Sequence, residues 1–176
     1  INRDVAERDG IRSVVLAHAF IVGGNATGSE RSISVGGVET VPLAAFDGIG
    51  YVALGHLHSP QELSNTVRYS GSPLPYSFGE SSHRKAVWIV DIDADGTCAV
   101  ARHDLPVVRG LAQLTGTMDE LLTDERFAES ADHYVSVTLT DDERPVDPMR
   151  RLQERFAHAI HVEWQRPQGV TELPYR

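Results

Sequence analysis

Segment 51–58 constrains the fold more than any other stretch, because it joins a buried strand to two histidines. It begins with a short apolar run, which predicts a β-strand, and ends in Gly55-His56-Leu57-His58. In an extended chain, side chains two positions apart lie on the same side, so His56 and His58 should leave the strand end together. Gly55 lacks a Cβ and permits a close approach or a sharp turn. Two neutral imidazoles there suit a divalent metal; the competing interpretation is two loop histidines bonded to carbonyl groups.

A second apolar segment, 13–24, supplies a further histidine. Its near-continuous apolar run predicts a central strand that is covered on both faces, and His18 lies close to the end of that run. A single histidine in such a run is more often a core residue with satisfied nitrogens. Open α/β sheets bind their ligands at the carboxyl ends of strands. Two strands that each bring an imidazole to that edge therefore favour a shared site.

The remaining pattern predicts an α/β (α+β) protein of two parts. Asp95-Gly96, between apolar runs at 86–93 and 98–103, is a strong hairpin signal, and residues 104–106 read as a boundary. Beyond the boundary the chain alternates between predicted strands and helices: strands at 107–115, 134–139 and 161–165, helices at 118–127 and 148–160. Asp147 precedes Pro148 as a plausible N-cap of the second helix. We therefore expect one domain over residues 1–106 and a two-layer α/β domain over residues 107–176.

Charge and cysteine content narrow the classes of function. The net charge is −9 with histidine neutral, which argues against a broad nucleic-acid patch. His83-Arg84-Lys85 is the only basic cluster outside the predicted helices, so phosphate contact is expected there and at Arg68; a solvated turn is the equal alternative. Cys98 is the only cysteine, and no apolar run is long enough to span a membrane, so we expect a cytoplasmic protein with no membrane contact.

Two downstream segments lead to a family resemblance. Segment 68–73 reads Arg-Tyr-Ser-Gly-Ser-Pro, and segment 77–80 reads Ser-Phe-Gly-Glu. Together with the His18 strand and Gly55-His56-Leu57-His58, this order resembles the metallophosphoesterase (calcineurin-like) superfamily, and within it the SbcD (bacterial Mre11-type) nuclease subunits. The resemblance implies the second half of a metallophosphoesterase β-sandwich over residues 1–106, followed by a small two-layer α/β capping domain over residues 107–176. The Asp-x-His, bridging Asp and Asn-His elements of that family are absent from the sequence, so the resemblance implies an incomplete active site.

The resemblance also implies a site and a reaction. It assigns His18 and His56 to one metal ion and His58 to the other, with two Mn²⁺ per complete site. It implies no catalytic residue in this chain. We expect substrate contacts at Arg68, Ser72, His83, Arg84 and Lys85. The intact protein is expected to be the nuclease subunit of an ATP-dependent complex that processes DNA double-strand breaks. Its activities would be metal-dependent 3′–5′ exonuclease and single-strand endonuclease. Its partners would be DNA, an SbcC/Rad50-type ATPase and a second copy of itself, and this chain alone is expected to be inactive.

Two other interpretations stay open. One is a different metallophosphoesterase that acts on nucleotides or phosphoproteins. The other is a non-catalytic module that binds DNA or a protein partner, in which the histidines are vestigial.

Overall fold

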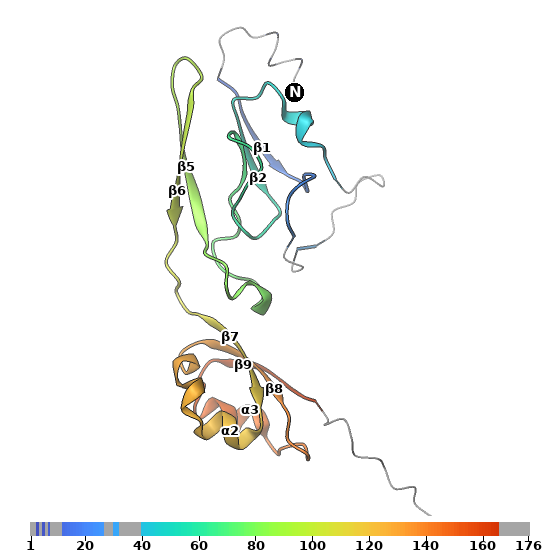
Figure 1. The fold of residues 1–176 in the computed structure, drawn as a ribbon, viewed down its shortest axis with the longest axis vertical. Helices are drawn as coiled ribbons and strands as arrows, with labels where there is room; N and C mark the ends of the chain where they lie inside the picture. The colour runs from blue at the N-terminus through green and yellow to red at the C-terminus, as the bar shows by residue number, and fades with distance from the viewer. Residues whose placement is uncertain are drawn as a thin grey trace, which may run out of the picture. The chain divides into compact units, whose positions relative to one another are not determined.

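The computed structural model describes residues 3, 5, 7, 12–26, 30, 31 and 40–165. The chain divides into two compact units, Ile1–Val107 and Val108–Arg176 (Figure 1). Strands dominate, with a few short helices, as expected for a mixed α/β chain. Among the described residues, no helix is long and apolar enough to cross a membrane.

The first unit contains a four-stranded sheet that sets up the candidate site. Its strands are β1 (Val14–His18), β2 (Tyr51–Gly55), β3 (Gln61–Glu62) and β4 (Val67–Tyr69), in the order β1-β2-β4-β3. β1, β2 and β4 are parallel, whereas β3 is antiparallel to β4. Parallel pairing places the carboxyl ends of β1 and β2 at one edge of the sheet, with His18 opposite Gly55. Core side chains of this unit include Ile21, Val52, Leu54, Leu57 and Tyr69.

The prediction of a central strand over segment 13–24 is wrong for the described part of the chain. β1 ends at His18 and lies at the edge of the sheet, with 55 % of Val14 and 82 % of Leu16 exposed. The inner strand is β2, where Tyr51, Val52 and Leu54 are buried. An apolar run indicates that both faces of a strand can be buried. It does not indicate which other segments bury them, or whether the strand lies inside the sheet or at its edge.

The predicted hairpin over residues 86–103 is confirmed. β5 (Ala86–Ile92) and β6 (Cys98–Asp104) pair antiparallel along their whole length. Gly96 has φ +87°, a backbone conformation that glycine adopts without strain, and its N–H donates to the Asp93 carbonyl. The Trp88 indole N–H donates to the Tyr69 carbonyl at 2.9 Å, which ties the hairpin to the four-stranded sheet. The described part of this unit also contains two 3₁₀ turns, η1 (Leu43–Phe46) and η2 (Phe78–Glu80).

The second unit is a three-stranded parallel sheet with its helices packed on one face (Figure 1). Its elements are β7 (Leu111–Gly116), α2 (Met118–Thr123), η3 (Glu125–Ser130), β8 (Tyr134–Leu139), α3 (Pro148–Gln153) and β9 (Ala159–Trp164). The strand order is β7-β8-β9. The predicted alternation of strand and helix is therefore confirmed. Val135, Val137 and Leu139 of β8 form the centre of the core against Leu121 and Leu152 of the helices.

The second helix of this unit is shorter than the sequence pattern predicts. α3 ends at Gln153, and Ile160 belongs to β9 with 60 % of its surface exposed. Pairing of β9 with β8 takes this segment out of the helix, because tertiary contacts override a weak helical preference. Asp147 stands at the N-cap position, but it has φ +46° and its side chain makes no capping hydrogen bond. Of these two helices it is α2 that has a side-chain cap, a capping box between Thr117 and Glu120.

Candidate functional site

His18 and His56 meet at the carboxyl edge of β1 and β2. Their ring centroids lie 5.4 Å apart, edge to face, and the Phe20 ring lies 6.1 Å from that of His56. Gly55 makes this approach possible. A Cβ at that position would lie 3.0 Å from Nδ1 of His18, closer than side chains normally pack. The parallel register thus brings two imidazoles from distant segments to one place.

The backbone at His56 ends the extended geometry of β2. His56 has φ +108°, a conformation that residues with a Cβ rarely adopt and that is often found at functional sites. The prediction that His56 and His58 leave an extended strand on one side is therefore wrong, because the strand stops at Gly55. His56 faces His18, whereas His58 has other partners.

The electrostatic surroundings favour a neutral His56. Burial lowers the pKa of His56 below its ordinary value, and a positive charge on His18 or His58 would lower it further; Glu30 acts in the opposite direction. A neutral imidazole retains the lone pair that a metal ion or a proton requires. The site therefore holds His56 in the form that can act as a ligand.

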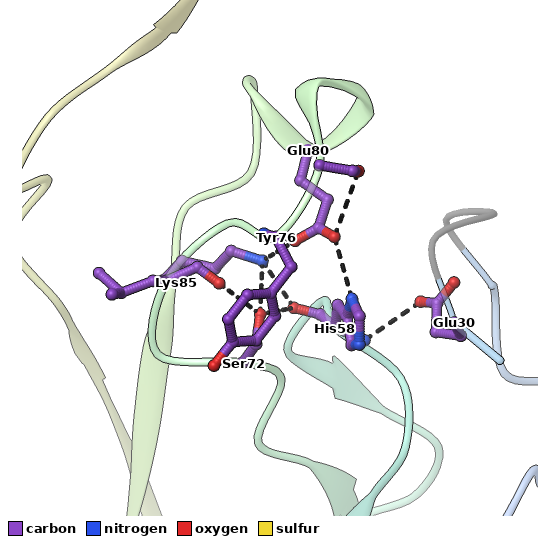
Figure 2. A network of polar contacts seen from close by, with 8 residues as sticks. Glu30, His58, Ser72, Tyr76, Glu80 and Lys85 are labelled. Atoms are coloured by element: carbon purple, nitrogen blue, oxygen red, sulfur yellow. Dashed lines mark hydrogen bonds and ion pairs between the residues drawn. The ribbon is translucent and has the colours of Figure 1, made fainter. Parts of the chain in front are cut away.

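His58 lies in a network of polar contacts on the other side of this loop (Figure 2). Its ring Nδ1 lies 2.9 Å from Oε1 of Glu80, and its backbone N–H donates to Oε1 of Glu30 at 3.2 Å. The Tyr76 ring packs edge to face against the imidazole, with centroids 5.5 Å apart. Side chain and backbone of His58 are thus both held.

Lys85 and Glu80 form a buried ion pair at the centre of the same network. Nζ of Lys85 lies 2.6 Å from Oε2 of Glu80, and the two residues are 6 % and 0 % exposed. The ammonium also donates to Oγ of Ser72 and to the carbonyl of His58, both at 2.9 Å, so its three hydrogens are used. Ser72 in turn donates to the Leu74 carbonyl at 2.7 Å.

Glu30 and Glu80 are the site residues that sequence reasoning missed. Glu80 lies in one of the motifs that carry the resemblance, but that resemblance assigned it no role. One signal could have pointed to the ion pair: Lys85 is the only lysine in the chain and follows Glu80 by five residues. Nothing in the local sequence indicates that Glu30 lies beside His58.

The five predicted substrate residues differ in how far their side chains are exposed. Ser72 and Lys85 are buried in the network just described, and the Lys85 ammonium donates to internal acceptors, so neither side chain lies at the surface for the predicted phosphate contact. Arg68 is also buried: its guanidinium pairs with Glu62, donates to the Asn65 carbonyl and lies over the Trp88 ring. Arg84 is exposed and His83 is half-buried, so these two remain as candidates for phosphate contact.

Imidazoles are ligands that a divalent metal ion accepts, but the described residues at this edge of the sheet bring together too few of them to hold one. His18 and His56 offer two imidazoles, and His18 also lines an open pocket of about 450 Å³ together with Gly55, Ser70 and Gly71. Within the described part of the chain, no group of three or more His, Cys, Asp or Glu side chains is placed to hold a metal. A metal ion at this edge would need further ligands.

Comparison with known proteins identifies relatives for both units. Residues 107–173 match the family SbcD_C, described as the type 5 capsule protein repressor C-terminal domain. Over 149 residues, 84 % of this chain, the sequence is 30 % identical to the D component of the nuclease SbcCD from Staphylococcus epidermidis. The aligned part makes up 40 % of that relative, so the chain spans well under half of its length.

Proposed function

We propose that this chain, which belongs to the SbcD family of nuclease subunits, contributes part of a metal-dependent site that hydrolyses phosphodiester bonds in DNA. The observation that carries the proposal is the meeting of His18 and His56 across Gly55 at the carboxyl edge of two parallel strands. That edge is where open α/β sheets bind their ligands.

In this proposal His18 and His56 bind one metal ion and His58 binds the second, with Mn²⁺ as the metal. A metal pair, when bound, supplies an activated water and stabilises charge on the phosphate. The chain's own residues keep His56 neutral, admit the His18 ring beside Gly55 and hold His58 in place. The proposal takes the remaining ligands from outside this chain, so this chain alone is expected to be inactive.

The architecture we propose for the first unit is the second half of a metallophosphoesterase sandwich, followed by a capping domain. The exposed edge strand β1 supports it, because Val14 and Leu16 present apolar side chains that a soluble fold would cover. The SbcD_C match over residues 107–173 supports the assignment of the second unit as the cap.

The proposed partners are DNA, an SbcC/Rad50-type ATPase and, in the intact protein, a second copy of the same subunit. The name of the relative describes one component of a nuclease called SbcCD, which supports a two-component enzyme. The net charge of −9 indicates that this chain does not attract DNA by itself. We therefore assign most of the affinity for DNA to other parts of the complex, with Arg84 and His83 as local phosphate contacts.

The test uses the intact protein that contains this chain, assayed with Mn²⁺ on linear duplex DNA and on single-stranded DNA. His56→Gln should reduce hydrolysis by at least the roughly 10–100-fold that loss of a metal's supporting residues costs. His161→Gln is the matched control, because His161 lies on β9 of the second unit and contacts Ser136. Equal activity of His56→Gln and the unaltered protein would contradict the proposal.

Two other outcomes would favour the alternatives. Hydrolysis of nucleotides or phosphopeptides, with DNA left intact, would indicate another kind of metallophosphoesterase. Binding of DNA or of a protein partner that neither Mn²⁺ nor His56→Gln affects, without hydrolysis, would indicate a non-catalytic module.

A further inference from the structure

We propose that the buried Glu80–Lys85 ion pair is a positioning device for His58, which fixes the orientation of the imidazole and keeps its proton on Nδ1. The inference deepens the proposed function, on which its purpose rests: a proton held on Nδ1 leaves the lone pair on Nε2, the atom that would then bind a metal ion or accept a proton. Glu80 and Lys85 are positioning residues here, since both act through His58.

The contacts hold His58 at three points. Oε1 of Glu80 lies 2.9 Å from the ring Nδ1 (Figure 2). Nζ of Lys85 lies 2.9 Å from the backbone carbonyl of the same histidine, and that carbonyl also accepts from the backbone N–H of Ser72 at 3.1 Å. The backbone N–H of His58 donates to Glu30. The loop begins at His56, whose backbone is strained, and these contacts hold the same loop in place at His58.

In the hydrogen bond between Nδ1 of His58 and Oε1 of Glu80, the charge of the carboxylate determines which atom donates. An ionised carboxylate has no hydrogen to donate, so the hydrogen between Nδ1 and Oε1 belongs to the imidazole. Lys85 lies 2.6 Å from the other oxygen of Glu80 and favours the ionised carboxylate. The backbone N–H of Tyr76 and the hydroxyl of Ser77 make longer contacts with the same carboxylate, at 3.3 and 3.4 Å. Glu80 is thus an acceptor at both oxygens.

The arrangement does more than pack the loop. A neutral histidine in water favours the other tautomer, with the hydrogen on Nε2, so a Nδ1–H form has to be selected by its surroundings. A carboxylate behind the ring selects it, and the same device orients histidine ligands in many metal sites. Two apolar residues of similar volume would stabilise the fold about as well as a buried ion pair does. The feature they could not supply is the acceptor for Nδ1.

The test measures the tautomer of His58 directly by nitrogen NMR on the metal-free full chain labelled with ¹⁵N-histidine, at about pH 8. We expect a pyrrole-type signal from Nδ1 and a pyridine-type signal from Nε2. In the double variant Glu80→Met/Lys85→Met, which removes both charges and keeps the volume, the ratio of the two tautomers should shift toward Nε2–H. The expected shift is roughly tenfold or more, the effect of losing a hydrogen bond to a charged acceptor.

Two controls separate positioning from stability. Glu62→Gln weakens another ion pair of this unit, Arg68–Glu62, and should leave the His58 signals unchanged. Thermal unfolding of the double variant establishes that it is folded. A pyridine-type Nδ1 or a doubly protonated His58 in the unaltered chain would overturn the inference, as would an unchanged tautomer ratio in the folded double variant. These readouts need neither metal nor activity, so they are independent of whether the nuclease proposal holds.

Discussion

Tyr69 accepts a hydrogen bond of 2.8 Å from the backbone N–H of Ile21, and its hydroxyl donates to the Ala19 carbonyl at the same distance. Ile21 is fully buried, and both partners belong to the segment directly after His18. A side chain of β4 thereby fixes the chain that leaves β1. One of the two partners, Ala19, directly follows His18, so the contact fixes the backbone next to the histidine, although the hydroxyl of Tyr69 bonds to the backbone rather than to the histidine pair.

Tyr69→Phe should destabilise the first unit by about 1–3 kcal/mol, because a backbone N–H and a backbone C=O would lose their partner in a buried place. Chemical denaturation followed by tryptophan fluorescence measures this change, since the Trp88 indole donates to the Tyr69 carbonyl. Tyr134→Phe is the control, because 39 % of Tyr134 is exposed, on a strand of the second unit. A loss no greater than that of Tyr134→Phe would contradict the role of the hydroxyl.

Gly55→Ala should displace the His18 ring and lower the free energy of unfolding by up to about 1–3 kcal/mol, the usual cost of an added methyl group in a packed place. The added Cβ would lie 3.0 Å from Nδ1 of His18, which is the end of a side chain that can rotate away. NMR signals of the His18 imidazole measure the displacement. Gly79→Ala is the control, since its Cβ would meet only the Ser77 hydroxyl at 3.6 Å. Unchanged His18 signals in Gly55→Ala would show that the site has room for a side chain there.

Leu152→Ala should destabilise the second unit by about 2–5 kcal/mol, because Leu152 is fully buried in its core. Ile160→Ala should have an effect of less than about 0.5 kcal/mol, since Ile160 lies exposed on β9. Thermal unfolding of both variants compares them. Similar losses would instead place both residues on one buried helical face, as the sequence pattern alone indicates.

The capping box of α2 should make the second unit sensitive to acid. The backbone N–H of Thr117 holds the pKa of Glu120 below its ordinary value of 4.5, with a smaller contribution from the threonine hydroxyl. A carboxyl whose pKa is lowered on folding stabilises the fold above its unfolded pKa, and this contribution is lost as pH falls through the folded pKa.

Unfolding measured between about pH 7 and pH 3 tests this dependence. Glu120→Gln should remove part of the loss of stability below pH 4.5, and Glu129→Gln, on the neighbouring 3₁₀ turn, should leave it in place. Identical acid profiles for Glu120→Gln and the unaltered chain would rule out this contribution.

Local patterns in the sequence predicted those elements whose causes are local. The hairpin of β5 and β6 follows from Asp95-Gly96, because glycine takes up the positive φ of the turn at no cost. The strand–helix alternation after residue 107 follows from the spacing of apolar residues. The predicted end of α3 was wrong because pairing between β9 and β8, which involves residues distant in the sequence, competes with helix formation.

For the candidate site, the sequence by itself determined which groups are available: three histidines, a glycine beside one of them and a single lysine near a glutamate. Only the tertiary structure decided how they combine. Parallel register brings His18 to Gly55 and His56, and the positive φ of His56 directs His58 to Glu80 instead. Lys85 belongs to a basic cluster in the sequence, yet its side chain is buried, because Glu80, Ser72 and the His58 carbonyl together replace the water that would hydrate it. Burial and pairing of charges depend on contacts between distant segments, which neighbouring letters in a sequence do not encode.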